Sequence, residues 1–417
     1  MKKIISFIVI VLICISANAQ VKKVLFLGNS YTYYNNLPQL LKDLALSYND
    51  SIYTDHSTPG GHYFAAHVTN STTLSKINQD NWDFVVLQEQ SQIPALPQSI
   101  TGGDYSPPHA KTLDSLIKNN YSCSETVFYM TWGRQNGDAS FCGQHPPVCT
   151  YNGMQQELRN TYMQMAQTNK STIAPVGVAW KAMRDSFPSI NLYNNDGSHP
   201  SLHGSYLAAC VFYCTLFQKS CIGSTFMPIG IGTGDAVTIQ TVATNTVLDS
   251  LSLWRINANH PTANFTYSGG GTINFNNTST NGATYFWDFG DGNTSTLQNP
   301  SNTYIANNTY QVKLIVYSND SCFTDTVTQQ ITITAAGLNE IEYNSNTILY
   351  PNPTNLNFSI KSNTSYSYGV IHNTTGKIVK EFSNEKSISI STLNKGIYFV
   401  KLYQGNAEIA IKKLIIN

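Results

Sequence analysis

Three residues have the side chains that nucleophilic catalysis needs, and they come from two distant segments of the chain. Ser30 follows Gly-Asn at the end of an apolar run, residues 24–27, while Asp196 and His199 lie three positions apart. A serine hydroxyl is a weak nucleophile until a base removes its proton, and an imidazole can act as that base. A carboxylate can hold the imidazole in the required tautomer and stabilise its charged form. The two segments together predict Ser30 as nucleophile, His199 as base and Asp196 as the orienting group.

Other polar residues and glycines follow further predicted strands. They are Gly60 and Gly61 after the second strand, Gln88 and Gln90 after the third, and Trp132 and Arg134 after the fourth. The carboxyl ends of parallel strands meet at one edge of a sheet, and ligands bind beyond that edge. We therefore expect all of these residues to lie near the triad, at the same edge.

A tetrahedral oxyanion needs fixed hydrogen-bond donors. The Ser30 N–H, a Gly60 or Gly61 N–H and a glutamine side chain could supply them. Strand alternation puts Gln88 and Gln90 on the same side, so both remain candidates. Trp132 and Arg134 either line the pocket or serve as a packing residue and a surface charge.

Residues 21–257 alternate between strand-like and helix-like patterns. The predicted strands are 24–27, 51–56, 84–87, 126–130 and 172–178, and the predicted helices are 38–47, 111–119, 154–167, 201–217 and 236–256. Apolar strands that alternate with helices indicate a parallel sheet covered on both faces. The sequence therefore predicts an α/β domain over this region.

Three motifs of this region resemble the SGNH (GDSL-like) hydrolase superfamily. They are Gly-Asn-Ser-Tyr-Thr at 28–32, Gly-Gly at 60–61 and Asp-x-x-His-Pro at 196–200. The resemblance covers about 21–257 and implies a flavodoxin-like three-layer sandwich with a parallel sheet. In that family the serine is the nucleophile, the Asp and His complete the triad, and a glycine N–H and an Asn side chain help to bind the oxyanion.

The third block of the family, Gly-x-Asn-Asp, is absent from this chain. Leu-Gln-Glu-Gln-Ser stands in its place at 87–91 and resembles the motif of one branch of the superfamily. The resemblance implies that a glutamine, either Gln88 or Gln90, replaces the Asn of the oxyanion hole. Glu89 between them is expected to form a structural pair.

Beyond a linker at 257–261 the pattern changes to short strands with polar alternation, which predicts an all-β region. Residues 262–335 resemble a PKD domain, on Trp-Asp-Phe-Gly-Asp-Gly at 287–292 and the run 312–316. This resemblance implies an immunoglobulin-like β-sandwich that acts as a spacer or as a weak glycan or protein binder.

Residues 346–417 resemble the type A sorting domain of type IX secretion. The motifs are Tyr-Pro-Asn-Pro at 350–353 and Leu-Asn-Lys-Gly-Ile-Tyr-Phe-Val-Lys at 393–401. The resemblance implies a second β-sandwich, the type IX secretion machinery as a partner, and export across the outer membrane of a bacterium of the Bacteroidota type.

The start of the chain has the features of a secretory signal peptide over residues 1–19. Two lysines precede an apolar run at 4–15, and Ala-Asn-Ala at 17–19 is a typical cleavage site. No later segment is apolar enough to cross a membrane, so we expect a mature chain without a transmembrane segment. The net charge is zero and 12% of the residues are charged, which gives no electrostatic case for nucleic acid.

Export permits disulfides, and the chain has 8 cysteines, of which Cys14 lies in the signal peptide. Cys142 and Cys149 bracket a loop rich in glycine and proline and are the expected pair. A zinc site formed by these two cysteines and His145 is the alternative, although it lacks a fourth ligand. The odd number of cysteines that remains leaves at least one thiol free.

These observations predict a secreted or cell-surface serine esterase that hydrolyses O-acyl esters without a metal or organic cofactor. Secretion and the accessory modules favour acetyl groups on carbohydrate as the substrate. Two alternatives remain at this point. One is a glycan-binding or adhesive surface protein with an inactive hydrolase fold, and the other is a lipase or thioesterase on the same scaffold.

Overall fold

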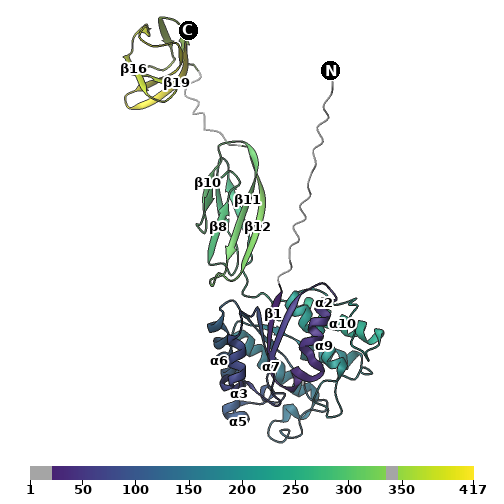
Figure 1. Cartoon of the computed structure of the whole chain (residues 1–417). Coiled ribbons are helices and arrows are strands. Elements are labelled where there is room, and N and C mark those ends of the chain that lie inside the picture. Colours follow the sequence, from purple (N-terminus) through teal and green to yellow (C-terminus); the bar gives the residue numbers. More distant parts are fainter. Residues whose placement is uncertain (1–20, 335–345) are drawn as a thin grey trace, which may run out of the picture.

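The computed structural model describes residues 21–334 and 346–417. The predicted signal peptide, residues 1–19, lies outside the described residues. Buried apolar side chains form three separate cores, over residues 24–256, 263–333 and 349–416. We call these regions the sheet domain, the central sandwich and the tail domain (Figure 1).

A five-stranded parallel sheet forms the middle of the sheet domain. Its strands are β1 (Lys22–Leu27), β2 (Ile52–Ser57), β3 (Phe84–Leu87), β4 (Glu125–Tyr129) and β5 (Thr172–Ala174). Their order in the sheet is β2-β1-β3-β4-β5, and every pairing is parallel. This is the flavodoxin-like order, with a change of direction between β1 and β3. The predicted fold class is confirmed.

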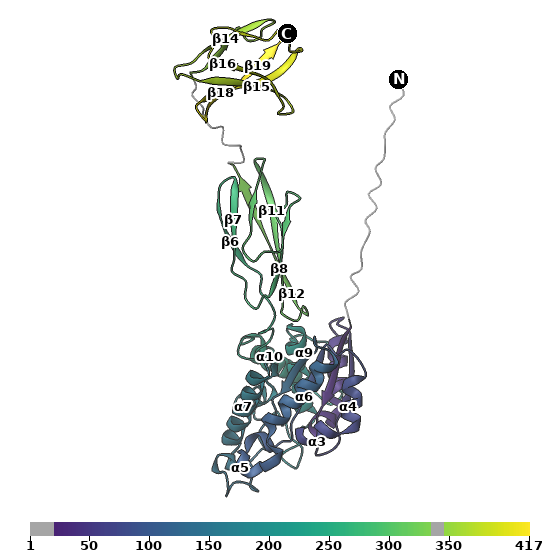
Figure 2. The ribbon, with the colours of Figure 1, turned by 90° about the vertical axis from the view of Figure 1, so that its left-hand side faces the viewer.

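Helices cover both faces of this sheet (Figures 1 and 2). On one side α2 (Leu37–Leu46) and α10 (Thr233–Leu248) pack against α9 (Leu202–Phe217), and on the other α6 (Ser106–Asn120) packs against α7 (Tyr151–Thr168). The remaining helices are α1 (Ser30–Tyr33), α3 (Phe64–Thr69), α4 (Ser71–Asn78), α5 (Gln98–Thr101) and α8 (Val176–Ser186), with 3₁₀ turns η1 (Tyr34–Asn36), η2 (Ile93–Ala95), η3 (Gly102–Asp104) and η4 (Pro146–Cys149).

Two predicted elements end earlier in the structure than the sequence indicates. The strand predicted at 172–178 stops at Ala174, and helix α8 begins two residues later. The buried residues Val176, Ala179 and Met183 follow helical spacing, so this apolar run contributes one face of a helix and no further strand. The helix predicted at 236–256 ends at Leu248, and turns follow it.

The central sandwich and the tail domain are each built from two antiparallel sheets. The central sandwich contains β6 (Phe265–Gly269), β7 (Thr272–Asn277), β8 (Thr284–Asp288), β9 (Thr294–Ser295), β10 (Ser301–Thr303), β11 (Asn308–Tyr317) and β12 (Thr324–Ile333), in sheets β10-β7-β6 and β12-β11-β8-β9. Trp287 and Phe289 lie in its core.

The tail domain contains β13 (Ile348–Tyr350), β14 (Asn357–Lys361), β15 (Tyr368–Asn373), β16 (Ile378–Ser383), β17 (Ile388–Ser389), β18 (Gly396–Gln404) and β19 (Ala407–Ile416). Its two sheets have the orders β13-β14-β17 and β16-β15-β18-β19. Both C-terminal regions are therefore β-sandwiches, as predicted.

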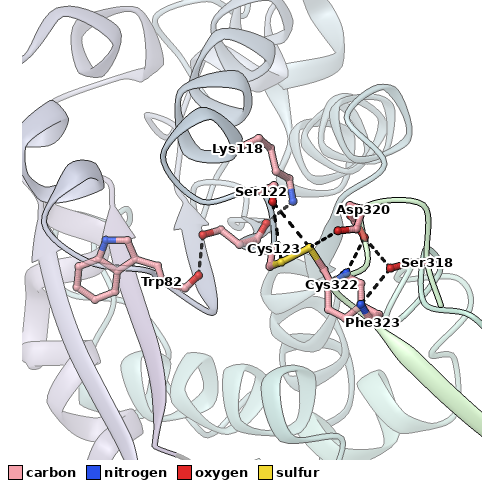
Figure 3. Close-up of a disulfide and its surroundings, with 9 residues drawn as sticks. Trp82, Lys118, Ser122, Cys123, Ser318, Asp320, Cys322 and Phe323 are labelled. Atoms are coloured by element: carbon pink, nitrogen blue, oxygen red, sulfur yellow. Dashed lines mark hydrogen bonds between the residues drawn. A yellow bond between two sulfur atoms is a disulfide. The ribbon is translucent and has the colours of Figure 1, made fainter.

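Two disulfides are present in the described part of the chain. Cys142 pairs with Cys149, which confirms the predicted pair and leaves no thiolate there for the alternative zinc site. Cys123 pairs with Cys322 and connects the sheet domain covalently to the central sandwich (Figure 3). The thiols of Cys210, Cys214 and Cys221 are free and buried.

Candidate active site

The three residues predicted to form a triad make one hydrogen-bonded chain at the carboxyl edge of the sheet. Ser30 is the first residue of α1, directly beyond β1, and its Oγ lies 2.8 Å from Nε2 of His199. Nδ1 of His199 lies 2.5 Å from Oδ2 of Asp196. A carboxylate only accepts hydrogen bonds, so Nδ1 carries the proton and Nε2 is free to accept from the Ser30 hydroxyl.

The Asp196 side chain is fixed by the backbone of its own loop. Its Oδ1 accepts hydrogen bonds from the amides of Ser198 and His199, both at 2.9 Å. Gly197 between them has a φ of 66°, in the left-handed region that glycine adopts without steric cost. Burial raises the pKa of Asp196, but the hydrogen bonds from the His199 side chain and the two amides outweigh burial and lower the pKa overall. The carboxylate is therefore charged at neutral pH.

Aromatic side chains pack against the loop that contains Asp196 and His199. The Trp132 Nε1–H donates to the Ser198 carbonyl at 3.0 Å, and the Tyr31 hydroxyl shares a 2.6 Å hydrogen bond with the Ser198 hydroxyl. The Tyr31 and Trp132 rings stack at 4.6 Å, and Tyr34 stacks on the His199 imidazole at 4.4 Å. Trp132 is fully buried and is not among the residues that line the cleft, so of its two predicted roles it has that of a packing residue.

The two glutamines of the third block have different surroundings, contrary to the expected alternation. Because β3 ends at Leu87, the following residues no longer alternate as in a strand. Gln88 is fully buried, and its Oε1 accepts from the Asn29 amide at 2.9 Å and the Thr32 hydroxyl at 3.0 Å. Gln88 therefore holds the loop that carries Ser30 and does not reach the cleft, whereas Gln90 lines the cleft.

Gly28 allows the close approach on which this loop depends. A Cβ at Gly28 would lie 2.6 Å from Oε1 of Gln88 and 2.8 Å from Oγ1 of Thr32. Its carbonyl accepts a 2.9 Å hydrogen bond from Nε2 of the buried His67, whose Nδ1 lies 2.8 Å from the Thr73 hydroxyl. Burial lowers the pKa of His67 to about 4, so the ring is neutral and its Nε2 keeps the donated proton.

His67 is not among the site residues that the sequence predicts. It lies on α3, a helix that the sequence pattern does not predict, and nothing in its neighbourhood along the chain indicates a partner. Gly28, the partner of its Nε2, is 39 positions away, so only the folded chain brings the two together.

Glu89 joins the second and third loops behind the cleft. Its Oε1 accepts hydrogen bonds from the amides of Phe64 at 2.9 Å and Gln90 at 2.7 Å. Burial raises the pKa of Glu89 to about 8, so the carboxyl group is mostly protonated at neutral pH. Glu89 thus has a structural role through backbone amides instead of the expected pair, and residues of both loops line the cleft.

The cleft in front of the triad has a volume of about 370 Å³. Six predicted residues line it: Ser30, Gly60, Gly61, Gln90, Arg134 and His199. Tyr33 and Tyr34 line it as well. Within residues 21–334 and 346–417, no hydrogen bond occupies the backbone N–H of Ser30, Gly60 or Gly61.

Comparisons with known proteins identify the two C-terminal modules. Residues 258–333 match the family model of the PKD domain, and residues 348–417 match that of the secretion system C-terminal sorting domain. Both resemblances seen in the sequence are confirmed. The PKD1 domain of Vibrio anguillarum Epp is 32% identical over 18% of this chain and 93% of that chain, with a TM-score of 0.17. No curated protein matches the chain.

The sheet domain is similar to solved structures of the same fold. A DUF4886 family protein from Bacteroides uniformis is 20% identical, over 55% of this chain and 95% of that chain, with a TM-score of 0.48. The psychrotrophic esterase EstA from Pseudoalteromonas sp. is 15% identical, over 47% of this chain and 97% of that chain, with a TM-score of 0.33.

The sorting domain implies the type IX secretion machinery as a partner of the chain. It indicates export, followed by secretion or attachment to the cell surface, as the sequence predicts. In the described ranges 21–334 and 346–417, no helix has both the length and the apolar character to cross a membrane.

Proposed function

We propose that the protein is a secreted serine esterase that hydrolyses O-acyl esters through an acyl-enzyme. The observation that carries this proposal is the continuous hydrogen-bonded chain from Ser30 Oγ through His199 to Asp196. It supports an active enzyme over an adhesive protein with an inactive fold, because a retained fold alone does not require all three groups within hydrogen-bonding distance.

In the proposed reaction Ser30 Oγ attacks the ester carbonyl carbon as its proton passes to Nε2 of His199. The carbonyl oxygen becomes an oxyanion, which accepts from the N–H of Ser30 and of Gly60 or Gly61. The C–O bond to the alcohol then breaks, and His199 returns the proton to the departing alcohol. Water attacks the acyl-enzyme by the same route, with His199 as base again, and releases the acid and free Ser30.

The lining of the cleft favours a short acyl group. Ser30 and His199 share the cleft with Asn29, Gln90 and Ser91, and no aliphatic side chain is among the described residues that line it. A long acyl chain would find no aliphatic side chain to pack against there, which argues against a lipase. An acetyl group fits this lining, and the exposed Tyr33 ring beside it is suited to contact a sugar. Acetylated carbohydrate is therefore the substrate class that we propose.

Hydrolysis of p-nitrophenyl acetate, butyrate and octanoate by the purified protein tests the proposal. We expect turnover of the acetate, a decline with chain length, and loss of activity in Ser30→Ala. Ser115→Ala, at an exposed position of α6, is the matched control and should keep full activity. Wild-type turnover no greater than that of Ser30→Ala on every ester would refute the esterase. Faster turnover of the octanoate would favour the lipase.

A further inference from the structure

Arg134 gives the catalytic cleft a positive charge that the proposed reaction does not use. It follows β4, and its side chain keeps 28% of its exposure while it lines the cleft with Ser30 and His199. Among the described residues that line the cleft, Arg134 is the one Lys or Arg, and none is Asp or Glu. The cleft therefore presents a cation to any substrate whose ester lies at Ser30.

A buried carboxylate holds the Arg134 side chain in place. Nη1 of Arg134 lies 3.5 Å from Oδ1 of Asp138, which is 1% exposed. The same carboxylate accepts from the Ser140 amide at 2.9 Å and from Nε2 of Gln92 at 2.5 Å. Since Gln92 also bonds to Gln90, this network ties Arg134 to the third loop of the cleft.

Most of the hydrogen-bonding capacity of the guanidinium group remains unused. A guanidinium has five N–H donors, and Asp138 takes up only Nη1, at a long distance. The Nε–H of Arg134 is buried and has no partner in the part of the chain that the structure describes.

We infer that Arg134 binds a carboxylate of the substrate, so that the ester this enzyme hydrolyses belongs to an acidic saccharide or a similar anionic alcohol. The inference rests on the proposed esterase function and specifies its substrate. The planar guanidinium matches a carboxylate through two parallel N–H···O hydrogen bonds, a geometry that a lysine does not provide. The acyl group lies at Ser30, and the carboxylate belongs to the alcohol part of the ester.

Matched small esters test the inference directly. We would compare 3- and 4-acetoxybenzoate with their methyl esters, which carry the same acetyl group and the same phenol but no charge. The wild type should have a kcat/KM higher by about 10- to 100-fold for at least one of the carboxylates, the range expected for hydrogen bonds to a charged group. Arg134→Gln should lower kcat/KM for the carboxylates far more than for the methyl esters and so remove this preference, and Arg134→Lys should keep part of it.

Arg159→Gln is the matched control, because Arg159 lies over the Trp254 ring outside the cleft. It should keep the full preference. Equal rates for charged and neutral esters in the wild type would overturn the inference. So would an equal loss on both esters in Arg134→Gln, since this would mean that the residue supports the site or the oxyanion instead of selecting an anion.

Binding separates this inference from the proposed reaction. In the Ser30→Ala background, calorimetry should show tighter binding of the acetoxybenzoate than of its methyl ester, and adding Arg134→Gln should abolish the difference. If the difference is present but the wild type hydrolyses neither ester, the esterase proposal fails and the anion site stands. If it is absent, the anion site fails. If the esterase and the anion site both stand, O-acetylated polygalacturonate should be a better substrate than acetylated xylan.

Discussion

At the carboxyl edge of the parallel sheet, loops from separate strands are joined by hydrogen bonds between buried polar groups, whereas at the amino edge a disulfide fixes a second domain. Gln88 and His67 hold the loop of Ser30 at the carboxyl edge. At the amino edge Cys123, two residues before β4, is bonded to Cys322 of the PKD domain (Figure 3).

Further contacts accompany the disulfide at the amino edge. His260 stacks on the Phe323 ring with centroids 3.8 Å apart, and its Nε2 lies 3.3 Å from Oε1 of Glu125, the first residue of β4. The Asn281 side chain donates to the carbonyls of Ala258 and His260 at the junction. The PKD domain is thus held against the sheet domain at the amino end of β4.

The difference follows from what each edge must do. Catalytic groups need exact distances and an open approach for the substrate, and a network of buried hydrogen bonds provides both. The amino edge contains no triad residue and can be covered, so it can carry the domain that leads to the sorting tail. Changes at the two edges should therefore have separate consequences.

Asp196→Asn should have the largest effect, and only on catalysis. The Asn Nδ2 is a donor, so Nδ1 of His199 would have to accept, and Nε2 would carry the proton and could not act as base. We expect kcat on p-nitrophenyl acetate to fall by about 10³- to 10⁴-fold with an unchanged circular dichroism spectrum. Asp320→Asn, at the amino edge, is the matched control and should keep the wild-type kcat. A kcat above a tenth of the wild-type value in Asp196→Asn would contradict the role of this carboxylate.

Removal of the disulfide that connects the two domains should lower stability and leave catalysis nearly unchanged. In Cys123→Ser/Cys322→Ser, we expect the free energy of unfolding to drop by about 2–4 kcal/mol, the usual contribution of a disulfide. The kcat on p-nitrophenyl acetate should stay within about twofold, because no group of the cleft moves. Limited proteolysis should cut the 257–261 linker faster than in the wild type.

The second disulfide provides the comparison for this variant. Cys142→Ser/Cys149→Ser loosens the loop that contains Asp138, whose amide donates to the Val148 carbonyl at 2.7 Å. It should therefore lower kcat/KM for the acetoxybenzoates, whose carboxylate Arg134 is inferred to bind. If removal of the Cys123–Cys322 bond lowers kcat/KM as much as removal of the Cys142–Cys149 bond, the separation of the two edges is wrong.

The pH dependence of stability should also differ between the two edges, and this effect should be smaller than that of removing the Cys123–Cys322 disulfide. Burial raises the pKa of Glu89 to about 8, above its ordinary value of 4.5. The folded chain then binds more protons than the unfolded chain between these values, so this residue makes stability fall as pH rises from about 4.5 to 8, by at most about 1.4 kcal/mol per pH unit. Denaturant unfolding at several pH values should show a shallower fall in Glu89→Gln.

Asp320 at the amino edge should act in the opposite direction. Burial raises its pKa, but hydrogen bonds from the Ser318 hydroxyl and the Cys322 amide outweigh burial and lower it overall. Its contribution to stability is present above the pKa of the unfolded chain and is lost as the solution becomes more acidic. Asp320→Asn should therefore weaken the loss of stability in acid and leave the slope from pH 4.5 to 8 intact. A steeper fall of stability from pH 4.5 to 8 in Glu89→Gln than in the wild type would contradict the assignment of this pH dependence to Glu89.

Much of the fold could be predicted from local patterns, because periodicity is a property of neighbouring residues. Strands β1 to β4 and helices α2, α7 and α9 lie within a few residues of their predicted bounds. Helix α8 was missed because a short apolar run after β5 fits a buried strand as well as one face of a helix. Helices α3 and α4 were missed as well, and with them the position of His67.

The sequence by itself determined the order of the elements, the two C-terminal modules and the three residues that could form a triad, since each depends on local pattern or on a recognisable motif. Only the tertiary structure decided which groups meet. It gave Gln88 and Gln90 different surroundings because β3 ends before both of them. It also buried Trp132 against the loop that contains His199. It also paired Cys123 with Cys322 across 199 positions, a contact between two domains that no local pattern specifies.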